Sequence, residues 1–203
     1  IQFTFEYDTS HTVLIKASSS TSEYGITLSI DATLPRYFLE EVASLYITPN
    51  DIIVRTVLDE ILTSYPLVPR WIAIRDWVSN NIRYVSDESA HGSAEYWQLP
   101  RETLQRRTGD CEDYSFLLVT LYRAVGYSAD RVFVVVGKNE NNPLAPYGVG
   151  HGWVRIQIDA IGWQSIEPQA PALATFVGDY LSLSGFTAYV YFNDVYIQLV
   201  RTS

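Results

Sequence analysis

The chain contains one cysteine, Cys111, so its fold can rest neither on an intrachain disulfide nor on a cysteine-based zinc cluster. Only three histidines are present, which is few for a histidine-rich metal site. Stability must therefore come from an apolar core, and 203 residues with 47% hydrophobic content can build one. We expect a single folded domain in which the cysteine is either a core residue or the reactive group.

The charge and composition restrict the partners and the setting of the chain. With a net charge of −9, the chain repels phosphate backbones, and we expect no nucleic-acid partner. No apolar run is long enough for a membrane-spanning helix. The chain starts at Ile1, lacks methionine and is poor in lysine but rich in Tyr, Ser and Thr. These features favour a mature or excised domain that is exported or displayed at the cell surface.

The hydrophobic periodicity places strands first, then helices, then strands again, which predicts an α+β domain. For the first helix, Thr48 is the expected N-cap and Pro49 the first helical residue. The polar segment 86–109 is predicted to be mainly loop, with a short helical turn near its end. The predicted strands lie within residues 1–30 and at 132–136, 152–158, 163–166, 186–192 and 195–200, and the predicted helices lie at 48–64, 69–83 and 110–126.

The helix that contains Cys111 is predicted to be capped by Asp110 and to end at Gly126. At a helix N-terminus, the dipole and the unpaired backbone N–H groups stabilise a thiolate and also an oxyanion formed next to it. The neighbouring acids Asp110, Glu112 and Asp113 act in the opposite direction, because negative charge raises the pKa of a thiol. A cationic partner is therefore required to activate the sulfur.

His151 is the candidate partner, because it lies between two glycines at the start of a predicted strand, where other groups can approach closely. The hairpin that follows is expected to place Val154 opposite Glu167 and so to bring this carboxylate near His151. Glu167 can then accept the imidazole N–H and hold the ring in one tautomer. Asp159 is the alternative orienting carboxylate, although the hairpin places it at the far end.

Three segments, in chain order, resemble the motifs of the transglutaminase-like superfamily. Residues 109–113 and their helix resemble the nucleophile motif, and residues 150–154 resemble the histidine motif. Residues 163–168 resemble the third motif, with Glu167 where the family usually has aspartate. Segments upstream of the cysteine resemble those of bacterial and archaeal members, so that the match covers about residues 68–168.

The resemblance implies a papain-like transglutaminase core of the α+β class. In such a core, the nucleophile helix packs on an antiparallel β-sheet, with N-terminal β-strands and helices added. It also implies a triad of Cys111, His151 and Glu167 that forms a covalent acyl-enzyme. We expect one domain over residues 1–203, consisting of a β-rich extension (1–47), a catalytic core (48–168) and a C-terminal β-hairpin region (169–203).

The expected function is that of a cysteine-dependent amide hydrolase, a protease or amidase, that acts on a protein or peptide. A transglutaminase, in which an amine accepts the acyl group, is the alternative, and a binding module that keeps the fold is a third reading. Trp97 or Gln98 is expected to add a second oxyanion donor beside the backbone N–H of Cys111, since both side chains carry N–H groups.

Three acids next to the nucleophile supply the hard oxygen ligands that calcium prefers, namely Asp110, Glu112 and Asp113. Some bacterial proteases that resemble this family bind calcium beside the cysteine. A calcium site at these acids is therefore a further hypothesis, and the alternative is that the acids simply suit the first turn of a helix. No other cofactor is required by the expected chemistry.

Overall fold

The β-branched and aromatic segments of the C-terminal half form one antiparallel sheet in the computed structural model, which describes residues 2–7, 13–18, 28–30, 45–92, 96–139, 149–159, 161–169 and 185–200. The five strands have the order β10-β9-β6-β7-β8, and every neighbouring pair is antiparallel. They are β6 (Val132–Asn139), β7 (Val149–Ile158), β8 (Gly162–Ile166), β9 (Phe186–Phe192) and β10 (Ile197–Leu199).

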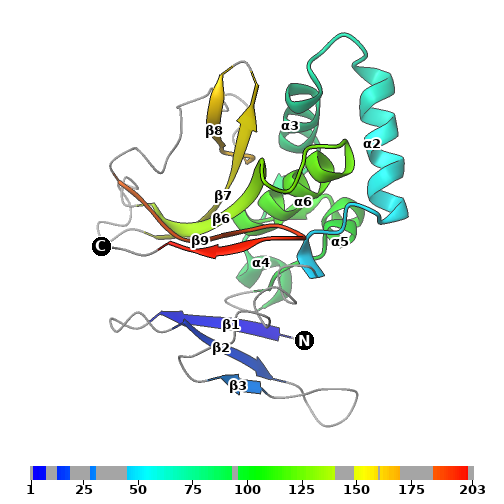
Figure 1. Ribbon diagram of the computed structural model, residues 1–203. Helices are drawn as coiled ribbons and strands as arrows, with labels where there is room; N and C mark the ends of the chain where they lie inside the picture. Colours follow the sequence, from blue (N-terminus) through cyan, green and yellow to red (C-terminus); the bar gives the residue numbers. More distant parts are fainter. Residues whose placement is uncertain are drawn as a thin grey trace.

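The helices lie on one side of this sheet (Figure 1). Helix α6 is buried along nearly its whole length and contacts β6 and β7 on one side and α2, α3 and α5 on the other. The predicted α+β fold, with the cysteine-bearing helix packed on an antiparallel sheet, is therefore confirmed. The helices are α2 (Ile52–Ser64), α3 (Arg70–Asn81), α4 (Asp87–His91), α5 (Pro100–Arg106) and α6 (Cys111–Ala124).

Helix α6 begins at Cys111 because the residues around it satisfy its first turn. The N-cap is Asp110, whose backbone N–H donates to the carboxylate of Asp113 at 3.3 Å, as in a capping box. At the other end Gly126 has φ of 108°, a left-handed conformation that favours glycine. Both predicted ends of this helix are confirmed, and Cys111 is thereby placed in its first turn.

The predicted start of α2 is wrong by three residues. Asp51, not Thr48, is the N-cap, and its carboxylate accepts a hydrogen bond from Ile53 N at 2.8 Å. The backbone N–H of Thr48 instead donates to Oγ1 of Thr120 in α6 at 3.3 Å, so Thr48 serves packing between helices. The short helix α4 is a second correction, because it lies within a segment predicted to be mainly loop.

The connection between β9 and β10 is longer than the predicted two-residue turn. Phe192 pairs with Ile197, so four residues, 193–196, form the loop. The buried Asn193 organises it: its amide nitrogen donates to the carbonyl of Val132 at 2.8 Å, and its Oδ1 accepts from two N–H groups within the loop. This long-range bond to β6 cannot be anticipated from local turn propensities.

Two smaller pairings complete the described structure. Near the nucleophile, β4 (Arg83–Tyr84) runs parallel to β5 (Thr108–Gly109). The predicted N-terminal strands form a three-stranded antiparallel sheet in the order β1-β2-β3. Its strands are β1 (Gln2–Tyr7), β2 (Val13–Ser18) and β3 (Leu28–Ile30).

Within the described part of the chain, no helix combines the length and the apolar character needed to cross a membrane.

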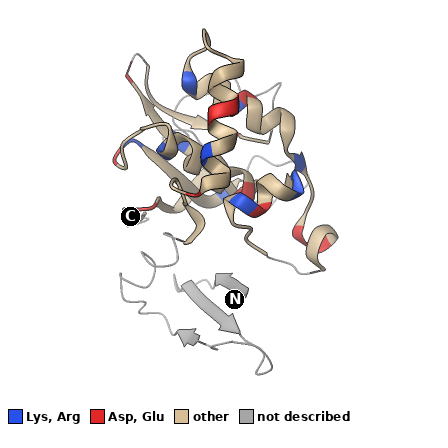
Figure 2. Cartoon of the chain, turned by 90° about the vertical axis from the view of Figure 1, so that its right-hand side faces the viewer, with Lys and Arg blue, Asp and Glu red and all other residues tan. Residues whose placement is uncertain are grey.

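On the face seen in Figure 2, basic and acidic residues are interspersed rather than gathered into a patch of one sign.

Gly137 is predicted to be essential for the sheet, because β6 and β9 shift register between Val136 and Gly137 and their backbones approach closely there. A Cβ at this position would lie 2.9 Å from Cα of Ala188 and even closer to the carbonyl oxygen of Thr187. We expect Gly137→Ala to lower the free energy of unfolding by about 3 kcal/mol, measured by urea denaturation. The matched control is Gly150→Ala on the paired strand, where a Cβ meets nothing within 4 Å. Equal losses in the two variants would contradict this reading.

Candidate active site

The thiol of Cys111 occupies the N-terminus of α6, where the residue itself is partly exposed. The sulfur donates a hydrogen bond to Oε2 of Glu112 at 3.1 Å and accepts one from the backbone N–H of Gly152. Among the hydrogen bonds of the described residues, none joins this thiol to the ring of His151. The nucleophile predicted from the sequence is therefore at a helix N-terminus, with its proton directed toward a carboxylate.

Burial raises the pKa of Cys111 well above its usual range, and the carboxylates of Glu112 and Asp110 raise it further. The N–H group of Gly152 opposes this shift, because it stabilises the thiolate. Within this arrangement the sulfur is held as a thiol. To react as a nucleophile, this thiol would first have to lose its proton to a nearby base.

Strand β7 meets the first turn of α6 at Gly152. A Cβ on this residue would lie 3.2 Å from both N and Cα of Glu112 and 3.3 Å from the carbonyl carbon of Cys111. A glycine is thus needed for this close approach. Because His151 directly precedes Gly152, the same contact brings the histidine into the neighbourhood of the nucleophile.

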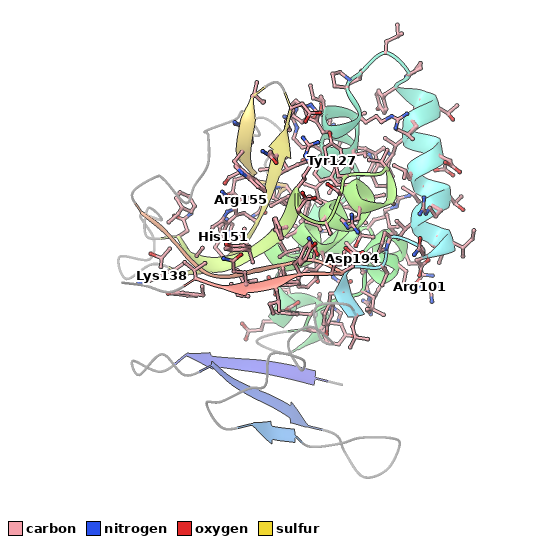
Figure 3. All side chains as sticks on the ribbon, in the orientation of Figure 1. Arg101, Tyr127, Lys138, His151, Arg155 and Asp194 are labelled. Atoms are coloured by element: carbon pink, nitrogen blue, oxygen red, sulfur yellow. The ribbon has the colours of Figure 1, made fainter. Side chains whose placement is uncertain are left out.

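His151 belongs to β7, where Figure 3 labels it. Its Nε2 lies 2.9 Å from both carboxylate oxygens of Glu167. Both side chains are largely buried, with exposed fractions of 11% and 18%. When a carboxylate faces Nε2, this nitrogen carries the proton, which leaves Nδ1 with a lone pair. In this tautomer Nδ1 is the nitrogen that is able to accept a proton.

The register that brings these two side chains together differs by one residue from the predicted one. Val154 pairs with Ile166 rather than with Glu167. Residues directly opposite each other in a sheet project from the same face, and a one-residue shift exchanges the faces. If the observed register is extended by one residue, Glu167 lies opposite Trp153 and therefore on the same face of the sheet as His151. The predicted register would have placed Glu167 on the opposite face.

Asp159, the alternative orienting carboxylate, is at the far end of the β7–β8 hairpin. It is exposed and forms an ion pair with Arg131. The structure thus brings Glu167, and not Asp159, to His151.

Gln98 and Trp97, the two candidate oxyanion donors, are both fixed by other contacts. The amide nitrogen of Gln98 donates to the carbonyl of Thr108 at 3.1 Å and to the carboxylate of Asp113, and the residue is 1% exposed. An amide nitrogen has two protons, so none is left for an oxyanion. The ring of Trp97 packs against Phe116 in the core, with centroids 4.9 Å apart.

The acids near Cys111 form two groups that share Asp110. One group contains Asp110, Cys111 and Glu112, and the other contains Asp87, Asp110 and Asp113, with ligand atoms within 4.8 Å of one another in each. Sequence reasoning missed Asp87, because it lies on the short helix α4 within a predicted loop, and only the tertiary fold brings it to α6.

Burial raises the pKa of Asp113 to about 7, and the charges of Asp110 and Asp87 add to this effect, while hydrogen bonds from Gln98 oppose it. Burial likewise raises the pKa of Asp87. Three carboxylates so close together repel one another when ionised, and a divalent cation would relieve this repulsion. The donor set of Asp87, Asp110 and Asp113 therefore suits a hard cation such as calcium.

The comparisons with known proteins agree with this geometry. The model of the transglutaminase-like superfamily matches residues 56–168, which include the cysteine, the histidine and the glutamate. The fold is similar to that of Legionella pneumophila LapG: the EGTA-treated form has a TM-score of 0.56 and 15% identity, over 83% of this chain and 87% of that chain. For the calcium-bound form the TM-score is 0.54 and the identity 17%, over 83% and 90%. No curated protein matches the sequence.

Replacing Glu112 by glutamine is expected to activate the thiol, since it removes a negative charge and the carboxylate acceptor next to Cys111. The pKa of Cys111 falls, more thiolate is present at neutral pH, and alkylation by iodoacetamide at pH 7 in EDTA becomes about tenfold faster. Mass spectrometry of the modified protein measures the rate. Glu60→Gln, on the exposed surface of α2, is the control; an unchanged rate in Glu112→Gln would show that the carboxylate does not hold the thiol.

Proposed function

The chain belongs to the transglutaminase-like superfamily, and on this premise we propose that it is a cysteine-dependent amide hydrolase with Cys111 as nucleophile, His151 as base and Glu167 as orienting carboxylate. The observation that carries the proposal is the His151–Glu167 pair. His151 lies on β7, and the next residue of this strand, Gly152, lies against the first turn of α6. The substrate would be a protein or peptide.

The first step in this mechanism is a change of partner for the thiol. Rotation about the Cα–Cβ bond of Cys111 turns the S–H group from Glu112 toward Nδ1 of His151, which accepts the proton. Glu167 accepts the hydrogen bond from Nε2 and stabilises the imidazolium. An ion pair of thiolate and imidazolium replaces the thiol, and this offsets the cost of a buried negative sulfur.

The thiolate then attacks the amide carbonyl carbon. A C–S bond forms and the π electrons of the carbonyl move to oxygen, which accepts a hydrogen bond from the backbone N–H of Cys111. His151 gives its proton to the nitrogen of the leaving amine, the C–N bond breaks, and a thioester remains. Water, deprotonated by His151, attacks the thioester and releases the carboxylic acid and the thiol.

The activity is tested with casein as a general protein substrate in the presence of dansylcadaverine, a fluorescent primary amine. We expect the wild type to release acid-soluble peptides, and Cys111→Ala and His151→Ala to lose this activity by at least about 1,000-fold. Glu167→Gln keeps the shape but removes the charge that stabilises the imidazolium, so an intermediate loss is expected.

Each outcome of this assay identifies one function. Incorporation of the fluorophore without release of peptides would indicate a transglutaminase. If there is neither product and Cys111 reacts with iodoacetamide no faster than a buried thiol, the fold serves as a binding module and the hydrolase proposal is wrong.

We further propose a calcium site at Asp87, Asp110 and Asp113. In support, these carboxylates lie close together, and burial, with smaller contributions from the charges of Asp110 and Asp87, raises the pKa of Asp113 to about 7. The fold similarity to a calcium-bound LapG points in the same direction. A bound cation would supply positive charge at the start of α6 and so oppose the effect of the acids on the pKa of Cys111.

Calcium is therefore expected to stabilise the folded protein, because it binds the native acids and not the unfolded chain. At saturating calcium the melting temperature of the wild type should rise by about 5 °C over its value in EDTA. Asp87→Asn should abolish this rise, whereas Asp59→Asn, on the exposed face of α2, should keep it. Differential scanning calorimetry measures the shift, and an equal rise in Asp87→Asn and wild type would contradict the site.

A further inference from the structure

Tyr84 is held beside the segment that enters the nucleophile helix. It belongs to β4 and pairs with Gly109 of β5, in parallel. Two backbone bonds flank it, from Arg83 N to the carbonyl of Arg107 at 2.9 Å and from Val85 N to that of Gly109 at 3.0 Å. Because β5 leads directly into the N-cap and first residue of α6, this pairing fixes the backbone of Tyr84 beside Gly109, two residues before Cys111.

The environment of the phenol is that of a group at the edge of the active site. Tyr84 is 54% exposed, so a substrate can reach it. Partial burial of the phenol and, after it, the nearby Cys111, Asp110, Glu112 and Asp87 together raise the pKa of Tyr84 to about 12. The phenol therefore keeps its proton beside a thiolate, and none of the described residues accepts a hydrogen bond from it.

The chemistry proposed above needs such a donor. An oxyanion on the attacked carbonyl forms close to the carboxylates of Glu112 and Asp110, which repel it. The backbone N–H of Cys111 offers one hydrogen bond, and the amide protons of Gln98 are used by Thr108 and Asp113. A neutral O–H group that cannot ionise at physiological pH stabilises negative charge without adding any of its own.

We propose that Tyr84 is a catalytic residue whose phenol donates a hydrogen bond to the carbonyl oxygen of the acyl substrate, as the second oxyanion donor beside the backbone N–H of Cys111. This inference rests on the proposed hydrolase function. When the C–S bond forms and the carbonyl π electrons move to oxygen, that oxygen accepts the O–H of Tyr84. The phenol retains its proton, and the proton of the thiol resides on His151.

Two reactions of the same thiol separate this role from a structural one. Acylation by p-nitrophenyl acetate passes through a tetrahedral oxyanion, whereas alkylation by iodoacetamide displaces iodide at a saturated carbon and forms none. Tyr84→Phe removes only the hydroxyl. We expect it to slow acylation of Cys111 by about 100-fold while the alkylation rate stays within about twofold of the wild type. Tyr196→Phe, at an exposed tyrosine of the β9–β10 loop, should change neither rate.

The outcomes distinguish this inference from the function on which it rests. If the wild type is acylated in a manner that depends on His151 but Tyr84→Phe is acylated equally fast, only the role of Tyr84 is overturned. Parallel losses in acylation and alkylation would also overturn it, because Tyr84 would then act on the thiol itself. A wild type that is not acylated at Cys111 would overturn the hydrolase proposal and this inference together.

Discussion

The contact between Gly152 and the first turn of α6 is the constraint on which the site depends. A Cβ at this position would meet the backbone of Cys111 and Glu112 at 3.2–3.3 Å, so any larger residue would push the strand and the helix apart by a few tenths of an ångström. Strand β7 lies between β6 and β8, and α6 is the buried centre of the helical layer. Cys111 and His151, the nucleophile and the base of the proposed mechanism, therefore belong to two packed elements that meet at one point, an arrangement that would keep reacting groups in place.

The charges around the start of α6 oppose ionisation of the Cys111 thiol, although a helix N-terminus is a position that favours a thiolate. A helix N-terminus favours a thiolate, but burial and the charges of Glu112 and Asp110 outweigh this effect at Cys111. Asp110 also caps α6, with Asp113 accepting its backbone N–H. The acids that make the helix begin at Cys111 are thus among those that keep its sulfur protonated. In the proposed mechanism such a thiol becomes reactive only when the local charge balance changes, through protonation of His151, a bound cation or a bound substrate.

Local sequence patterns predicted most helices and strands, whereas the strand register and the contacts between distant residues depend on the tertiary structure. The cysteine helix and its ends followed from the apolar spacing, a capping acid and Gly126, all of which act within a few residues. The predicted register of the β7–β8 hairpin was wrong by one residue. Gly162, which has φ of 78°, pairs with Ile158 as part of β8 instead of belonging to the loop. Asp87 was missed because nothing near it in sequence indicates that it meets Asp110. The pairing of His151 with Glu167 was predicted from the hairpin and from the resemblance of residues 163–168 to the third motif of the family; the pair is observed, although the register assumed for the hairpin is not.

Glu167 stands where the family usually has aspartate, and its longer side chain reaches His151. Its two oxygens lie at the same distance from Nε2 of His151, so the carboxylate itself has no preferred oxygen. What determines its position is the end of β8, and there the carbonyl of Pro168 accepts a hydrogen bond from the buried hydroxyl of Ser79 at 2.6 Å. Ser79 belongs to α3, which packs against α6. The residue after Glu167 is therefore tied to the helical layer that contains Cys111, while the carboxylate of Glu167 itself contacts His151.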